Sequence, residues 1–418
     1  MVQTDPAAPE VGAVDLEAVP LGRSVNPAVP EDGQRAPRLR VGLVRVRAPV
    51  VGVVTRVPGR LERRSRIAEV DHVDPITPRT TVGRLAEALT LSAAAAIGVY
   101  ADAQTAAAKA DEAHVLALEL GDPGAILDAT WAHALAAHAK GELPARLREY
   151  LRATHDLPEL ATRVFDGQLC VTERMLYGGL PNHEIIAFAD NLAAEAKRIG
   201  AARGHAFALT LRGEATILAG RLDEADRDFA EGARLHGQIG AVAGEALSLL
   251  GRAQVAIHRG RPEHATPYLT DALLMARESE VGHHTLDRIY GAMVDGAADP
   301  ERGMQLVCEA ESAIQGPAET CPTCRIACIV PATIAAARGG DAELADRYLG
   351  HCETALEIVA LPPAWHAAVA EARGWVARSR GRADDARAHF HTAADGFSTW
   401  GQPLDAQRCA ALAGLIQA

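Results

Sequence analysis

Apolar and polar positions alternate with a helical period from about residue 83 to the end of the chain. Helix-length segments, in which apolar residues recur every three or four positions, are separated by short turns built on glycine. Alanine dominates the apolar fraction, and it is the strongest helix former. Five stretches align on their turns: LAGRLDEADRDFAEGA, IHRGRPEHATPYLTDA, VDGAADPERGMQLVCEA, AARGGDAELADRYLGHC and RSRGRADDARAHFHTAA. The pattern predicts an all-α body.

Four columns of this alignment each keep one type of side chain. The first column is small and lies in the helix before the turn: Gly213, Ala253, Gly291, Thr333 and Gly374. A second small column follows the turn: Ala225, Ala265, Gly303, Ala345 and Ala386. One helical turn later comes a larger apolar column: Phe229, Leu269, Val307, Leu349 and Phe390. Another small column completes the set: Gly232, Ala272, Ala310, Cys352 and Ala393.

These columns predict antiparallel helix pairs. Small residues let two helices approach closely, and the bulky residue between them fills the gap to the next pair. The pitch is 40, 38, 42 and 41 residues, and such pairs must stack because none can bury its apolar face alone. We therefore expect a right-handed superhelical solenoid of eight pairs and a closing helix over residues 81–418. Its turns should lie near Gly141, Gly179, Gly220, Gly260, Ala298, Gly340 and Gly381.

Residues 1–80 have a different composition. They are rich in Pro, Gly and Ala and then in Arg, without a helical pattern, which predicts a disordered leader. A basic arm for nucleic acid or acidic lipid is the alternative interpretation. The net charge of the chain is −12; residues 1–80 are near +2 and residues 81–418 near −14, so we expect no direct nucleic-acid binding by the solenoid. No run is apolar enough to span a membrane and no signal peptide is evident, which predicts a cytoplasmic protein with reduced cysteines.

The Gly-x-x-x-x-Ala turn, with its small and aromatic columns, resembles the tetratricopeptide repeat. The pitch near 40 and the Ala- and Arg-rich helices resemble the C-terminal sensor region of large bacterial LuxR-type and maltose-regulator-like signalling ATPases and related transcriptional activators. In those regulators the superhelix is a platform for a partner or effector. No Gly-x-x-x-x-Gly-Lys-Ser/Thr loop occurs here, and no segment resembles a helix-turn-helix, so the resemblance implies the platform role alone.

The leading functional expectation is therefore a non-enzymatic scaffold without a cofactor. It would bind a protein or peptide, or else a small effector, in its concave groove, as the sensor module of a bacterial regulator. The resemblance implies that the first helix of each pair lines this groove. The row just after the first small column is Glu173, Glu214, Gln254, Ala292, Ile334 and Trp375, and a neighbouring row is Arg212, Arg252 and Arg373. The alternative is that these side chains pair within the solenoid.

Three cysteines fall within eight residues, at Cys321, Cys324 and Cys328, and Cys308 lies on the preceding helix. If a helix begins at Cys321, the three share one face, and four thiolates suit zinc. Only one Cys-x-x-Cys half is present, however, and Cys352 shows that a small column accepts sulfur as packing. Packing is the preferred interpretation, and a metal- or thiol-dependent sensor using these four cysteines is the alternative.

The histidine pair at His283 and His284 is assigned to the surface. No cysteine or carboxylate lies near it at a repeating ligand spacing.

Overall fold

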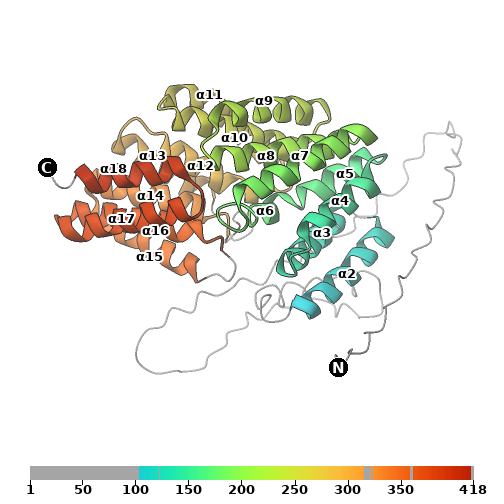
Figure 1. The fold of residues 1–418 in the computed structure, drawn as a ribbon, viewed down its shortest axis with the longest axis horizontal. Coiled ribbons are helices and arrows are strands. Elements are labelled where there is room, and N and C mark those ends of the chain that lie inside the picture. The colour runs from blue at the N-terminus through green and yellow to red at the C-terminus, as the bar shows by residue number, and fades with distance from the viewer. Residues whose placement is uncertain (1–102, 122, 315–320, 322, 358–360, 416–418) are drawn as a thin grey trace, which may run out of the picture. The chain divides into compact units, whose positions relative to one another are not determined.

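The computed structural model describes residues 103–121, 123–314, 321, 323–357 and 361–415. Over these residues the chain forms seventeen α-helices and two short 3-10 helices, and no strand (Figure 1). The predicted all-α class is confirmed for this part of the chain. The predicted leader, residues 1–80, and the start of the first predicted pair lie outside the described residues.

The first half of the described chain contains α2 (Ala103–Leu120), α3 (Pro123–Ala139), α4 (Leu143–Thr154), α5 (Pro158–Asp166), α6 (Leu169–Thr172), α7 (Asn182–Ile199), α8 (Ala202–Leu218), α9 (Leu222–Gln238) and α10 (Val242–His258). The second half contains η1 (Pro262–His264), α11 (Ala265–Glu278), η2 (Gly282–His284), α12 (Leu286–Asp295), α13 (Pro300–Ala313), α14 (Ile326–Gly339), α15 (Ala342–Leu356), α16 (Ala364–Ser379), α17 (Ala383–Thr399) and α18 (Pro403–Leu415). Successive helices pack side by side, most extensively from α7 to α11 and from α16 to α18 (Figure 1).

Most helices end at a glycine in the left-handed conformation. Ten glycines of the described chain have φ between 63° and 93°, a region in which a Cβ is unfavourable. After several of them, the next residue donates its N–H to the carbonyl five positions earlier, as Arg221 does to Thr216 at 2.9 Å and Arg261 does to Ala256 at 3.0 Å. Left-handed glycines recur every twenty residues from Gly200 to Gly260, which explains a pitch of 40 for a helix pair.

The turns lie at the predicted positions. They join α3 to α4, α6 to α7, α8 to α9, α10 to α11, α12 to α13, α14 to α15 and α16 to α17. The turn near Ala298 uses a different device, because the carboxylate of Asp299 caps α13 by accepting from the Arg302 N–H at 2.8 Å. The pair around Gly179 departs from the regular plan. Its first helix is split into α5 and α6, and residues 173–181 form turns.

The predicted columns are places of close helix approach. The fully buried ring of Phe229 on α9 fits between Gly213 of α8 and Gly251 of α10. A Cβ would lie 2.8 Å from a ring carbon if built on Gly213 and 2.3 Å if built on Gly251, so neither position accepts a side chain without movement. The ring of Phe390 meets Gly374 in the same way, at 2.6 Å. In these pairs, a phenylalanine ring on one helix thus packs against a glycine on the neighbouring helix.

Pro331 lies inside α14 and cannot donate a hydrogen bond to the carbonyl of Ala327. That carbonyl faces Gly291 of α12, where a Cβ would lie only 2.0 Å from its oxygen. The absence of a side chain at Gly291, a position of the first small column, thus lets the backbone of α14 approach α12 closely.

Among the described residues, none of the helices combines the length and the apolar character that crossing a membrane requires.

Replacing Gly251 by Ala should lower the free energy of unfolding by about 1–3 kcal/mol, because the added methyl overlaps the enclosed Phe229 ring. Gly350→Ala is the matched control. Gly350 lies on the exposed face of α15 with no atom near its missing Cβ, so this variant should gain about 0.5–1 kcal/mol from helix propensity. Denaturant titrations followed by circular dichroism measure both. Equal stability of the two variants would contradict the packing.

Candidate metal centre

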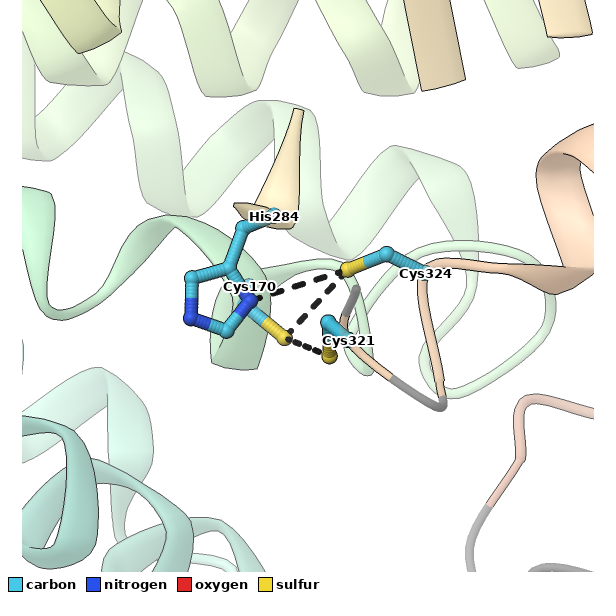
Figure 2. Close-up of side chains that lie close together, drawn as sticks. All are labelled: Cys170, His284, Cys321 and Cys324. Carbon is cyan, nitrogen blue, oxygen red and sulfur yellow. Dashed lines mark hydrogen bonds between the residues drawn. The ribbon is translucent and has the colours of Figure 1, made fainter. Parts of the chain in front are cut away.

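Three cysteines and one histidine from distant parts of the chain meet at one point (Figure 2). Cys170 lies on the short helix α6, His284 ends η2, and Cys321 and Cys324 precede α14. We call these four residues the Cys/His cluster. Cys170 and Cys321 are 151 positions apart, so the cluster joins segments that no local periodicity relates.

The ligand atoms of the cluster lie close enough together to share one metal ion. The sulfur of Cys170 lies 3.6 Å from that of Cys321 and 3.5 Å from that of Cys324. The sulfur of Cys324 lies 3.9 Å from Nδ1 of His284, and all four ligand atoms lie within 4.8 Å of one another. Bonds to zinc of about 2.3 Å from sulfur and about 2.0 Å from nitrogen place tetrahedral corners about 3.5–3.8 Å apart. The cysteines are free thiols, and their spacing matches shared coordination.

The cluster is shielded from solvent. The three cysteines are 2–6% exposed and His284 is half-buried. Hydrogen bonds from Cys170 and Cys324, together with the nearby imidazole, hold the pKa of Cys321 well below its usual range despite burial. Burial alone would lower the pKa of His284, but the sulfurs of Cys170 and Cys321 raise it well above its usual range. The site therefore favours a thiolate beside a cation, the charge arrangement that a metal ion supplies.

Polar neighbours support the sulfur atoms from outside the cluster. The hydroxyl of Thr323 lies 3.0 Å from the sulfur of Cys321, and a carboxylate oxygen of Glu173 lies 3.5 Å from that of Cys324. Such second contacts orient metal ligands. Three thiolates and one imidazole form the ligand set of closed structural zinc sites, in which protein atoms fill all four positions. The residues present fit a zinc ion.

A buried ion triad adjoins the cluster. Arg288 on α12 pairs through Nε with Glu173 at 2.7 Å and through a terminal nitrogen with Glu214 on α8 at 2.7 Å. Burial raises the pKa of Glu173 to about 7, and the Arg288 guanidinium limits this rise. One cation thus holds two carboxylates that come from different helix pairs.

The cluster differs from the set of cysteines singled out in the sequence. Cys321 and Cys324 belong to it, but Cys308 is exposed on α13, and Cys328 packs against Tyr290 in a separate apolar cluster. The physical reason is the start of α14. This helix begins at Ile326, so Cys321 and Cys324 lie before it and do not share a helical face with Cys328.

Cys170 and His284 escaped the sequence reasoning. The assignment of His284 to the surface is wrong, because its imidazole is half-buried against the three sulfurs. A signal for both was available in the repeat itself. The columns fail around residues 155–182, and the paired histidines stand where a regular helix would start; η2 and α6 occupy these irregular places.

The charged residues of the two expected groove rows have partners within the chain. Glu173 and Glu214 pair with Arg288, as described above. Arg212 pairs with Asp190 and Asp228, Arg252 with Asp226 at 3.2 Å, and Arg373 with Glu353 at 3.2 Å. Trp375 is half-buried, meets Phe390 edge to face, and has Arg338 and Arg378 near its ring. Gln254 is half-buried, Ala292 is buried and Ile334 is partly buried.

No model of a known protein family matches the chain, and a search of curated proteins gives no match. The functional assignment therefore depends on the Cys/His cluster and on the helical repeat.

Replacing Arg288 by Gln should lower the free energy of unfolding at neutral pH by about 3–5 kcal/mol, because two buried carboxylates lose their cation. The control is Arg302→Gln, which removes an exposed ion pair with Glu309 and should change stability by less than about 0.5 kcal/mol. Both are measured by denaturant unfolding. A small loss for Arg288→Gln would mean that the triad contributes little to the fold.

Proposed function

We propose that this chain is a non-enzymatic interaction scaffold whose distant helix pairs are held together by a structural zinc ion. The ligands would be Cys170, His284, Cys321 and Cys324. The observation that carries the proposal is the convergence of these four ligand atoms, all within 4.8 Å of one another, in a site shielded from solvent. Zinc is favoured over other ions because sulfur and imidazole ligands in a closed tetrahedron are typical of it.

A structural role is favoured over a catalytic one by the closure of the site. Four protein ligands leave no corner for water or substrate, whereas catalytic zinc keeps one position open. The cavity beside the cluster is also small. It has a volume of about 20 Å³, is lined by residues that include Glu173, Arg174 and Trp365, and holds about one water molecule.

The scaffold role is supported by the repeat. Helix pairs with a pitch of 38–42 residues, most of them turning at a left-handed glycine, would stack into a right-handed superhelix of the tetratricopeptide type. In line with the resemblance to bacterial regulator sensor regions, the partner would be a protein or peptide, or a small effector. The charged residues of the two expected rows form ion pairs within the chain. Their first role would therefore be to stabilise the scaffold itself.

Purified protein should contain about one equivalent of zinc, measured by mass spectrometry of the metal. Cys170→Ser and Cys321→Ser should each lose it, because three ligands bind far more weakly than four. The cobalt-substituted protein should show the charge-transfer and visible bands of a tetrahedral site with several thiolates.

Matched controls are available in the same chain. Cys328 and Cys352 are buried thiols in apolar surroundings, so their Ser variants should keep the zinc even if stability falls. A fully helical protein without metal would contradict the proposal. A disulfide between Cys170 and Cys321 in that metal-free protein would instead support a thiol-dependent sensor.

A further inference from the structure

Residues 173–181, which we call the linker, connect α6 to α7 and touch helices far along the chain. The ring of Tyr177 stacks on Trp365 of α16, with centroids 4.9 Å apart. The N–H of Ala364 donates to the carbonyl oxygen of Tyr177 at 2.8 Å. A Cβ on Gly178 would lie 2.8 Å from the ring of Trp400. In a stacked repeat each pair meets only its neighbours, so these contacts bypass several pairs.

The next residue after the linker continues this connection. The side-chain amide of Asn182 donates to the carbonyl oxygen of Gly401 at 2.9 Å, across 219 positions. The start of α18 also reaches an early turn, because Pro403 lies 3.0 Å from the Cβ position of Gly220. The linker and the residues around it thus connect the start of α7 and the turn after α8 to α16, the end of α17 and the start of α18.

The linker has little regular structure of its own to hold it in place. It consists of turns, and Tyr177 adopts a positive φ of 54°, which non-glycine residues rarely do. Its apolar side chains are nevertheless enclosed, since Met175 and Leu176 are at most 2% exposed. Backbone hydrogen bonds within the linker, such as that from the Leu180 N–H to the carbonyl of Met175 at 2.7 Å, shape its turns, and contacts with the rest of the chain hold it in place.

The Cys/His cluster lies at the start of this linker. Cys170 is three positions before Glu173, and Glu173 contacts both Arg288 and Cys324. A metal bound to Cys170, His284, Cys321 and Cys324 would fix the beginning of the linker to the segments around η2 and α14. Trp365, which receives Tyr177, lines the cavity beside the same cysteines.

We infer that the metal centre is a latch for the linker: bound metal keeps the linker docked against α16 and the end of α17, and loss of metal releases it and uncovers the rings of Trp365 and Trp400 that it contacts. This inference rests on the proposed zinc site. It adds a means of regulation, because metal occupancy would decide whether the early and late pairs of the scaffold stay joined. Coupling of this kind is reciprocal, so loosening the linker must also weaken metal binding.

Hydrogen exchange of the full chain, zinc-loaded and then treated with a chelator, tests the latch directly. The Ala364 amide reports docking, since it is bonded to the linker carbonyl of Tyr177. Its exchange, and that of the linker amides, should accelerate by about tenfold or more after chelation. The Arg261 amide, bonded to the carbonyl of Ala256 at 3.0 Å at the turn after α10, should not change, because among the described residues no contact of the linker or of α18 is made at this turn.

The reciprocal test uses two tryptophans. Trp365→Ala removes the stacking partner of Tyr177 without touching a ligand, and it should weaken zinc binding about tenfold in competition with a chromophoric chelator. Trp375→Ala is the control, because Trp375 contacts Phe390 and not the linker, and its zinc affinity should be unchanged.

The outcomes separate the two proposals. Protein that binds no zinc overturns both. Zinc-loaded protein in which chelation leaves Ala364 and the linker protected overturns the latch and leaves the zinc site standing. Acceleration at Arg261 equal to that at Ala364 also overturns the latch, since the metal would then hold the whole fold. Selective acceleration at Ala364, with weaker zinc binding in Trp365→Ala alone, supports the latch.

Discussion

The left-handed glycine that follows many of the described helices, and each of α7 to α10, is the constraint on which the rest of this structure depends. It stops a helix at a fixed length and reverses the chain within three residues, and it does so every twenty residues from Gly200 to Gly260. Equal helices bring the same positions of successive pairs into contact. This alignment places the ring of Phe229 against the glycines at 213 and 251. It likewise places the ring of Phe390 against Gly374.

Successive helices of the described chain pack mainly on their neighbours in sequence. The long-range contacts arise where the regular plan fails. The helix before Gly179 is broken into α5 and α6, and the turn before α12 contains η2. These irregular segments carry Cys170, His284 and the linker, which reach across the array to Cys321, Trp365 and Trp400. Residues in such irregular segments are not needed for the regular helix packing, so they can take part in a binding site.

The repeat could be predicted from sequence because its causes are local. Turn glycines, small columns and aromatic positions act over one helix pair, and the observed turns lie where these residues place them. The cluster could be predicted only in part, because Cys170 and His284 come from distant segments without periodicity. The shared face expected for Cys321, Cys324 and Cys328 assumed a helix that starts at Cys321. Since α14 starts at Ile326, the first two cysteines are free to turn toward Cys170.

The chain contains two kinds of buried cysteine, and the difference lies in their surroundings. Cys328 and Cys352 lie in apolar clusters, where the sulfur of Cys352 also contacts the Thr333 hydroxyl at 3.5 Å, and burial raises the pKa of each to about 12. These two behave as the packing interpretation expects of sulfur in a small column. Cys321 is equally buried, yet its pKa is well below the usual range because hydrogen bonding with the thiols of Cys170 and Cys324 lowers it and the imidazole of His284 stands beside it. Packing accounts for a cysteine that contacts carbon, whereas a cysteine that contacts two further sulfurs, a histidine and a hydroxyl has the environment of a ligand.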